Sequence, residues 1–265
     1  MSNSTMPVIF SGHGSPMLAL EDTDVTHGLK TLGTKIMEKF GKPKAILAVS
    51  AHWYTRGTFV QSMENPKQVY DMYGFPQALY DFKYPVKGDT ALADRVLSLL
   101  GDRVSVNNDW GIDHGTWTVL CHVFPEADIP VVQLSVDGTL TKDEIYEIGK
   151  SLTPLRDEGY LIFASGNVVH NLRRVEWENP NGSPKCTAFN DAITEYVLER
   201  NDKAVMEYEA VPNAAYAVPT PEHYLPLIYM LGAAEGEKAT VFNNHCELGA
   251  IAMTGYAFGL SGLSA

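Results

Sequence analysis

The stretch Ala45–Trp53, A-I-L-A-V-S-A-H-W, decides how the rest of the chain is interpreted. Its apolar run Ile46–Val49 has no polar alternation, which is typical of a strand buried on both faces in a parallel sheet. The run ends in two small residues, 50 and 51, and then places His52 at the C-terminal end of the strand. In open α/β sheets this is the edge at which ligands bind.

The same pattern occurs twice more in the chain. The apolar residues Val8–Phe10 lead into Ser-Gly and His13, and Leu161–Phe163 lead into Ala-Ser-Gly-Asn, with His170 three residues further on. Three buried strands that each end in small residues and a histidine predict three imidazoles at one edge of the sheet.

The remaining elements fit one α/β domain that spans residues 1–265. A helix over 29–40 separates the first two strands, and this β-α-β opening predicts a right-handed crossover and a parallel pairing. Further strands are expected at 58–63, 104–106, 130–136, 160–164, 239–243 and 251–258, and further helices at 89–100, 118–124, 141–158, 183–200 and 221–234. Thr141 and Glu144 are spaced as a capping box, and Thr220 is a candidate N-cap.

Composition excludes several classes of partner. The formal net charge is −12 over 265 residues, so the chain repels phosphate backbones and anionic membranes, and we expect neither nucleic acid nor membrane as a partner. No apolar run approaches the roughly 20 residues that a spanning helix needs. Residues Met1–Met6 lack a basic and an apolar region, which predicts a short frayed leader rather than a signal peptide. Cys121, Cys186 and Cys246 have no C-x-x-C spacing, which favours reduced thiols in the cytoplasm.

The segment Val69–Val86 follows neither a helical nor a strand period, and prolines and glycines interrupt it. A long aromatic loop in a compact domain is often functional, as a wall or lid of a pocket, but its rings can equally fill a small secondary core. The residues leave both interpretations open. Its rings are Tyr70, Tyr73, Phe75, Tyr80, Phe82 and Tyr84.

The eight histidines carry the functional argument collectively. His13, His52 and His170 share the strand-end context, and His223 lies at the expected start of a helix. Several neutral imidazoles at one edge suit Zn, Fe, Cu or Ni, and they suit Mg or Ca poorly, because those ions prefer oxygen. His27, His122 and His245 lack this context and are expected to be surface or structural residues.

His114 lies in a polar, glycine-punctuated loop over 107–117. Its unperturbed pKa lies close to working pH, so it is a candidate general acid or base, and an ordinary hydrogen-bonded histidine is an equally good interpretation. The chain contains no H-E-x-x-H, G-x-S-x-G, P-loop or G-x-G-x-x-G motif, so the corresponding metalloprotease, hydrolase and nucleotide chemistries have no support.

Five ordered motifs carry a resemblance to a known family. They are G-H-G-S-P at 12–16, S-A-H-W at 50–53, D-H-G-T-W at 113–117, G-N-V-V-H-N-L at 166–172 and T-P-E-H-Y-L-P-L at 220–227. Together they resemble the class III extradiol ring-cleaving dioxygenases, and within them the 4,5-DOPA dioxygenase subgroup. The resemblance covers nearly the whole chain, including the aromatic G-F-P-Q-A-L-Y-D at 74–81.

The resemblance implies a single α/β domain with a central, largely parallel mixed sheet flanked by helices on both faces. It also implies one mononuclear divalent metal per chain. By matching motifs, His13, His52 and His223 would be ligands, His170 would be a fourth ligand or an acid/base, and His114 would be a second acid/base. The expected partners are a catechol such as L-DOPA and O2, with the chain as a monomer or a small homo-oligomer.

The third ligand is the one departure from the wider class. That class uses two histidines and a carboxylate for Fe(II), whereas here both Glu222 and His223 occupy the position; the subgroup pattern favours His223. An all-histidine site also binds Zn readily. Fe(II) is therefore expected for turnover, Zn(II) can occupy the purified protein, and a zinc-dependent hydrolase that uses the same cluster is the alternative function.

Overall fold

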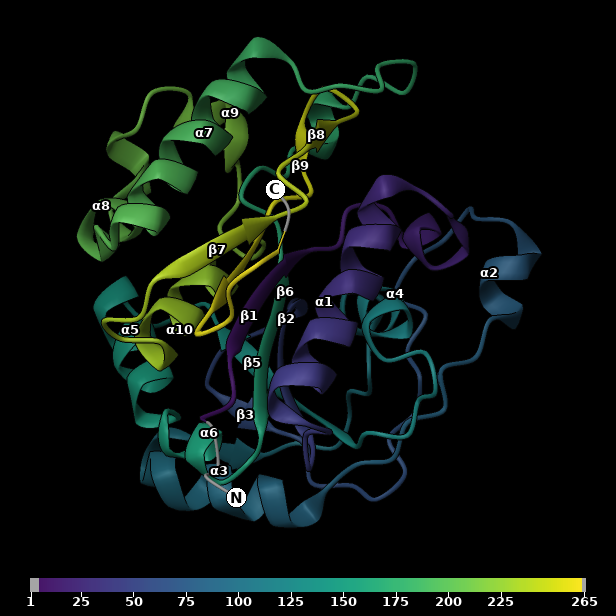
Figure 1. Cartoon of the computed structure of the whole chain (residues 1–265), viewed down its shortest axis with the longest axis vertical. Coiled ribbons are helices and arrows are strands. Elements are labelled where there is room, and N and C mark those ends of the chain that lie inside the picture. The colour runs from purple at the N-terminus through teal and green to yellow at the C-terminus, as the bar shows by residue number, and fades with distance from the viewer. Residues whose placement is uncertain (1–4, 264–265) are drawn as a thin grey trace.

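A mixed eight-stranded sheet runs through the middle of the computed structural model, which describes residues 5–263 (Figure 1). The strand order is β4-β3-β5-β2-β6-β1-β10-β7, and β8 and β9 form a separate small ladder. The bounds are β1 Val8–Gly12, β2 Ile46–Thr55, β3 Phe59–Val60, β4 Ser105–Val106, β5 Val131–Asp137, β6 Leu161–Gly166, β7 Ala239–Phe242, β8 Cys246–Glu247, β9 Ile251–Ala252 and β10 Gly255–Phe258. The four central strands β5, β2, β6 and β1 are parallel, whereas β10 and β7 on one side and β3 on the other join antiparallel.

Helices cover both faces of the sheet. One buried core packs α3, α5, α7 and α10 against one face, and a second packs α1, α4 and the 3-10 helix η1 against the other (Figure 1). The bounds are α1 Asp24–Phe40, α2 Gln77–Asp81, α3 Thr90–Leu100, α4 His114–Val123, α5 Lys142–Ser151, α6 Pro154–Asp157, α7 Pro184–Glu199, α8 Asp202–Met206, α9 Ala214–Ala217, α10 Leu225–Ala233, η1 Pro16–Leu20, η2 Gly101–Arg103, η3 Leu172–Arg174 and η4 Tyr208–Ala210. The predicted single α/β domain with a largely parallel sheet and helices on both faces is confirmed.

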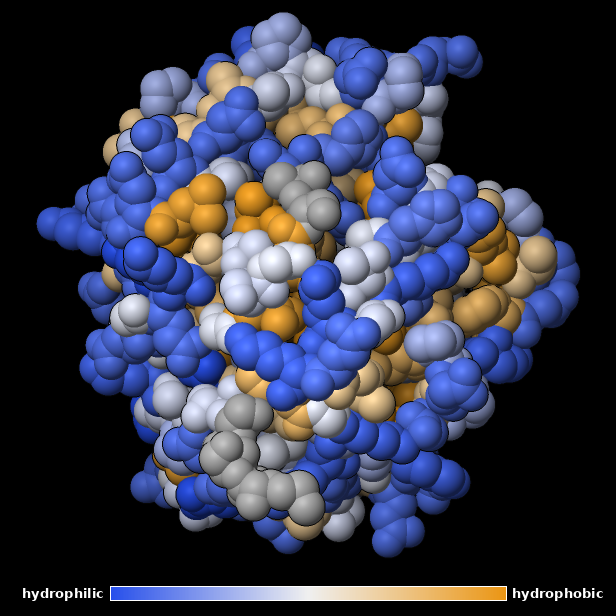
Figure 2. Space-filling model, viewed as in Figure 1, coloured by the Kyte–Doolittle hydropathy of each residue, from blue (hydrophilic) through white to orange (hydrophobic). Residues whose placement is uncertain are grey.

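The surface is mostly hydrophilic. Hydrophilic residues cover most of the face seen in Figure 2, and apolar residues show between them in smaller areas. Among residues 5–263, none of the helices combines the length and the hydrophobicity that crossing a bilayer requires.

The opening β-α-β unit corrects one expectation. The first two strands are parallel, as predicted, but they are not neighbours, because β6 lies between them and pairs with both. The predicted direct pairing of β1 with β2 is therefore wrong. Because β6 lies between β1 and β2, the ends of all three histidine-bearing strands are side by side: Gly12 pairs with Gly166, and Ser50 pairs with Ser165.

Strand β2 continues past the predicted histidine instead of ending there. Ser50 pairs with Ser135 and Tyr54 pairs with Val136, so residues 51–53 form a bulge that has no counterpart on β5. Bulges redirect side chains next to functional sites. His52 lies on this bulge.

Two predicted helices differ from the structure because of proline. The helix expected over 221–234 begins only at Leu225, since Pro226 has no N–H to donate and fits only in a first turn. Thr220 consequently does not cap it; its hydroxyl donates to Glu222 instead. The helix expected over 141–158 keeps its capping box but divides into α5 and α6, and Pro154 starts the second.

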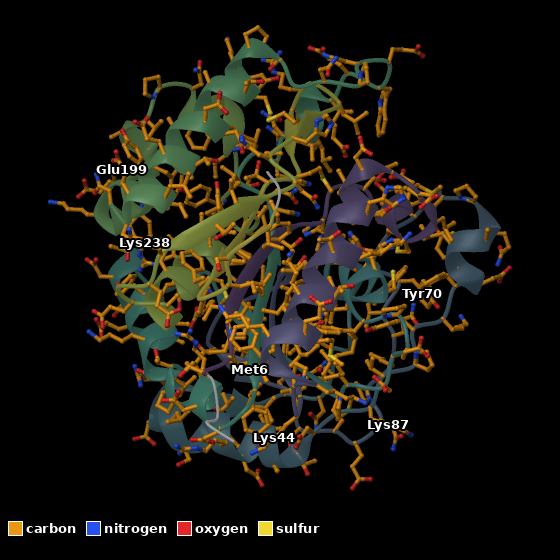
Figure 3. The ribbon with its side chains drawn as sticks, in the orientation of Figure 1. Met6, Lys44, Tyr70, Lys87, Glu199 and Lys238 are labelled. Carbon is orange, nitrogen blue, oxygen red and sulfur yellow. The ribbon has the colours of Figure 1, made fainter. Side chains whose placement is uncertain are left out.

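The prediction of a frayed leader is wrong for Met6. Met6, which is labelled in Figure 3, is buried. Its N–H donates to the carbonyl oxygen of Arg156, and Arg156 Nε donates back to the Met6 oxygen at 2.7 Å. Residues 1–4 of the leader lie outside the described residues. At the first helix, a Thr23–Thr26 capping box starts α1 at Asp24, five residues before the predicted boundary.

Candidate metal centre

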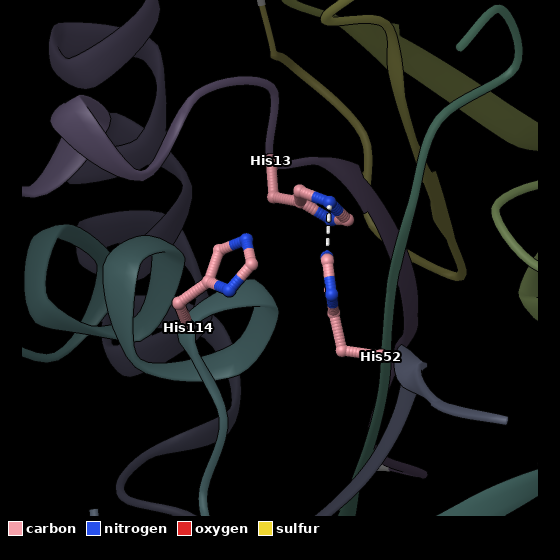
Figure 4. Close-up of side chains that lie close together, drawn as sticks. All are labelled: His13, His52 and His114. Atoms are coloured by element: carbon pink, nitrogen blue, oxygen red, sulfur yellow. Dashed lines mark hydrogen bonds between the residues drawn. The ribbon is translucent and has the colours of Figure 1, made fainter. Parts of the chain in front are cut away.

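Five imidazoles meet at the C-terminal edge of the central strands. His13 follows β1, His52 lies on the β2 bulge, His170 follows β6, His114 begins α4 and His223 lies in the turn before α10. The ring centres of His13, His52 and His223 form a triangle with sides of 4.9, 5.1 and 5.2 Å. The structure thus brings together all the histidines that the sequence singled out, and Figure 4 shows three of them facing one another.

Polar contacts at Nδ1 indicate where four of these rings carry their proton. Ser165 Oγ donates to the carbonyl oxygen of Gly115, so it must accept from His13 Nδ1, which is 2.8 Å away. The Nδ1 atoms of His52 and His114 both lie against the carboxylate of Asp71, at 3.1 and 2.8 Å. The Nδ1 of His223 is 3.1 Å from Glu222 Oε1. A carboxylate only accepts, so each ring keeps its proton on Nδ1 and leaves Nε2 with a free lone pair.

The free Nε2 atoms fit a metal ion. His13 Nε2 and His52 Nε2 are 3.1 Å apart, and His223 Nε2 is buried with no hydrogen-bond partner among residues 5–263. Two nitrogens that bind one ion at about 2.1 Å, with a ligand angle of 90–109°, are about 3.0–3.4 Å apart. Two lone pairs facing each other at this distance repel unless a cation or a shared proton lies between them.

Distances between the potential ligand atoms define two groups. Ligand atoms of His13, His52 and His114 lie within 4.8 Å of one another, and so do those of His170, Glu222 and His223. His170 stacks on His223 with ring centres 3.5 Å apart and planes only 8° apart. The lone pair of an imidazole nitrogen lies in the ring plane, so two rings stacked in near-parallel planes would not direct their lone pairs at one shared ion.

Glu222 serves as the outer partner of His223. Its Oε1 also accepts from the Thr220 hydroxyl at 2.8 Å, and its side chain is more exposed than that of His223. This arrangement favours His223 over Glu222 as the group that faces the centre. The sequence alone left that choice open.

Burial keeps most of the cluster neutral. Loss of solvation lowers the pKa of His13, His170 and His223 well below the usual value, and repulsion from neighbouring imidazoles lowers it further. Burial also lowers the pKa of His52, but the hydrogen bond to Asp71 and the nearby negative charges outweigh it, and the net direction is upward. Burial tends to raise the pKa of Asp71, but its bonds to His114 and His52 outweigh that effect and lower it. Neutral imidazole is the form that binds metal.

Close packing at two glycines keeps the rings in place. A Cβ on Gly115 would lie 2.8 Å from His52 Cδ2 and 3.0 Å from Ser50 Oγ. A Cβ on Gly166 would lie 2.3 Å from the carbonyl oxygen of His223. The small residues next to each histidine thus allow close backbone approach.

His114 lies on a helix rather than in the predicted loop. Asp113 caps α4 by accepting from the N–H of Thr116 at 3.2 Å. The buried Asp113 carboxylate also accepts from Ser50, Trp110 and Gln133 at 2.7–2.9 Å, which ties the helix start to β2 and β5. The Asp-x-x-Thr spacing was a capping signal that the sequence prediction missed.

The aromatic segment supplies Asp71, which sequence reasoning also missed. Around Asp71, Tyr70 (Figure 3) and Phe82 pack on Trp117 with ring centres 5.6 and 5.7 Å away, whereas Tyr73 is 92% exposed. The less exposed rings of the aromatic segment therefore form a small secondary core, which was one of the two interpretations of this segment. An acidic residue among aromatic residues carried no spacing signal that linked it to the histidines.

The remaining histidines lie outside the cluster, as predicted. His27 is on the surface of α1, with its ring 2.9 Å from Asp22; His122 Nε2 is 2.8 Å from the carbonyl oxygen of Leu18; and His245 is exposed.

Comparisons with known proteins show which family the chain resembles over nearly its whole length. The family described as the catalytic LigB subunit of aromatic ring-opening dioxygenase matches residues 7–259. A protein of Escherichia coli K12 named 4,5-DOPA dioxygenase extradiol is 43% identical over 98% of this chain and 97% of its own. A protein of the same name from Beta vulgaris is 39% identical over 94% of this chain and 95% of its own.

A solved structure has the same fold. The crystal structure of an uncharacterized protein from Escherichia coli K12 superposes with a TM-score of 0.80 at 40% identity, covering 96% of this chain and 100% of that chain. The predicted resemblance is confirmed. The chain belongs to the LigB family of aromatic ring-opening dioxygenases and is an extradiol dioxygenase.

Proposed function

We propose that this enzyme uses O2 to cleave the ring of a catechol such as L-DOPA, giving the 4,5-seco product, at a single divalent metal held by His13, His52 and His223. The observation that carries the metal assignment is the pair of facing Nε2 atoms of His13 and His52, 3.1 Å apart. The unpartnered, buried Nε2 of His223 supplies the third ligand. The relatives named 4,5-DOPA dioxygenase extradiol support the substrate class.

When bound, Fe(II) would supply the redox chemistry that couples oxidation of the catechol ring to reduction of O2. Mg and Ca are poor candidates because the inward donors are nitrogens. Zn fits the same donors but has no accessible redox change.

Two histidines would handle the protons. Asp71 holds the proton of His114 on Nδ1, so Nε2 is the atom that would take a proton from a catechol hydroxyl. His170 stacks on His223 and so is poorly placed to bind the same ion, and we assign it an acid/base role rather than that of a fourth ligand. Burial lowers the pKa of His170, so the ring is neutral in the free enzyme, which is the form that a general base needs.

The test is oxygen uptake after anaerobic loading of the metal-free protein with Fe(II). A panel of catechols that includes L-DOPA should show O2 consumption and a yellow ring-opened product. Absence of both with L-DOPA excludes that substrate, and absence with every catechol contradicts the proposed reaction.

A zinc-dependent hydrolase is the competing function, because the all-imidazole donor set also fits Zn, which lowers the pKa of bound water to about 7. That function predicts turnover of an ester or amide by the Zn-loaded protein under argon. A ring-cleaving dioxygenase cannot work without O2, so the two assays separate the functions.

A further inference from the structure

We propose that Asp71 is a positioning residue that fixes the tautomers of two histidines at once, and that through His52 it sets how tightly the chain holds its metal. The proposal rests on the function proposed above, because it takes His52 as a metal ligand. It adds a role for the aromatic segment, which supplies this carboxylate from outside the histidine motifs.

The two oxygens of Asp71 have different partners. Oδ1 accepts from the backbone N–H of His114 at 3.1 Å and from its Nδ1 at 2.8 Å. Oδ2 lies 3.1 Å from Nδ1 of His52. A carboxylate has no proton to donate, so both imidazoles must carry theirs on Nδ1 and direct a bare Nε2 into the site.

The backbone on the N-terminal side of Asp71 is held by residues on both sides of His114. The N–H of Val69 donates to the carbonyl oxygen of Ile112 at 2.8 Å, and the Val69 oxygen accepts from Trp117 Nε1 at 3.0 Å. The side chain of Asp71 is only 13% exposed. The carboxylate is therefore fixed relative to the start of α4, and a substitution of the same size can test its chemistry without moving it.

Replacing Asp71 with asparagine should affect the two histidines differently. The Oδ1 position receives two donors from His114, so the amide oxygen must occupy it. The amide nitrogen then takes the place of Oδ2 and donates to His52 Nδ1, which has to give up its proton. His52 becomes the Nε2–H tautomer, with no lone pair facing the metal, whereas His114 is unchanged.

The experiment compares wild type, Asp71→Asn and the matched control Asp81→Asn, each metal-free at pH 8.5. Asp81 belongs to the same aromatic segment but is exposed, and its carboxylate accepts from Gln77. Imidazole ¹⁵N chemical shifts report the tautomers, with signals assigned through His52→Gln and His114→Gln variants. Chelator competition reports the affinity for Zn(II), and neither readout requires turnover.

We expect Nδ1–H for both histidines in the wild type and in Asp81→Asn. In Asp71→Asn we expect Nε2–H at His52 alone, with Zn(II) affinity about 10–100-fold lower, the usual effect of losing a carboxylate behind a histidine ligand. Wild-type Zn(II) affinity in Asp71→Asn overturns the proposal. So does an Nε2–H tautomer at His52 in the wild type, a result that requires no variant to fold. Failure of the proposed function would give a different result from failure of this proposal: the wild-type protein would bind metal but consume no O2 with any catechol.

Discussion

Ser165, Asp71 and Glu222 hold the Nδ1 protons of four imidazoles, so each ring has one fixed outer contact and one free inner nitrogen. A substitution at a histidine therefore removes an inward lone pair and also leaves a buried acceptor without its donor. The consequence differs with the role of the ring, and this difference separates ligands from acid/base groups.

His52→Ala should abolish metal binding. The variant loses one of three inward nitrogens and leaves Asp71 Oδ2 without its partner. We expect metal analysis after dialysis against Zn(II) or Fe(II) to find almost none, while the surface variant His27→Ala binds as the wild type does. Wild-type metal content in His52→Ala would show that His52 is not a ligand.

His114→Ala should keep the metal and lose rate. A general acid or base contributes about 100-fold to 10,000-fold, so kcat with a catechol should fall within that range at full metal content. The contrary outcome is specific, because ligand atoms of His13, His52 and His114 also lie within 4.8 Å of one another. Metal loss equal to that of His52→Ala would place His114 among the ligands.

At the scale of elements, the strands were easier to predict than the helix starts. The runs at Val8, Ile46 and Leu161 are buried along their whole apolar length, so the uninterrupted apolar pattern was enough to locate them. Helix starts depend on one side chain or one proline. With Asp113 as its N-cap, α4 starts at His114, before the predicted residue 118. With Pro226 in its first turn, α10 starts at Leu225, after the predicted residue 221. Strand neighbours depend on long-range packing, which explains why the position of β6 was not predicted.

Asp113→Ala should destabilise the fold far more than Asp89→Ala, although both residues cap helices. Asp89 caps α3 through one bond to Leu92 N–H, so its loss should lower the free energy of unfolding by about 1 kcal/mol. Asp113 is fully buried and holds three more donors, so several kcal/mol should be lost at about 1–3 kcal/mol for each unpaired group.

Urea denaturation of the two metal-free variants measures this difference. Only Asp113→Ala should also reduce kcat/KM, because α4 carries His114 in its first turn. Equal losses of stability would mean that the Asp113 network adds nothing beyond an ordinary cap.

At the scale of the whole molecule, the site is assembled from segments that are far apart in the chain, from His13 to His223. The shared strand-end pattern made the convergence of three imidazoles predictable. His223 and His114 were candidates from their own contexts, and the family motifs connected them to the same site. Asp71 was not predictable, because it lies in a segment without periodicity, which long-range hydrogen bonds from Val69 to Ile112 and Trp117 hold beside the site. The sequence pattern therefore indicated which side chains could bind metal, but it did not indicate which residue orients them.

Metal binding should therefore stabilise the entire fold. The three proposed ligands come from opposite ends of the chain, so an unfolded chain cannot hold them in one geometry, and the ion binds the native state preferentially. At 100 times the Kd, mass action adds about 2.7 kcal/mol, and for a chain of this size each kcal/mol raises Tm by about 2–4 °C. Thermal unfolding of metal-free protein with increasing Zn(II) should show this rise. Mg(II) should produce none, because it prefers oxygen ligands. His52→Ala should lose the Zn(II) response, and an undiminished rise in that variant would mean that the stabilising ion binds at another site.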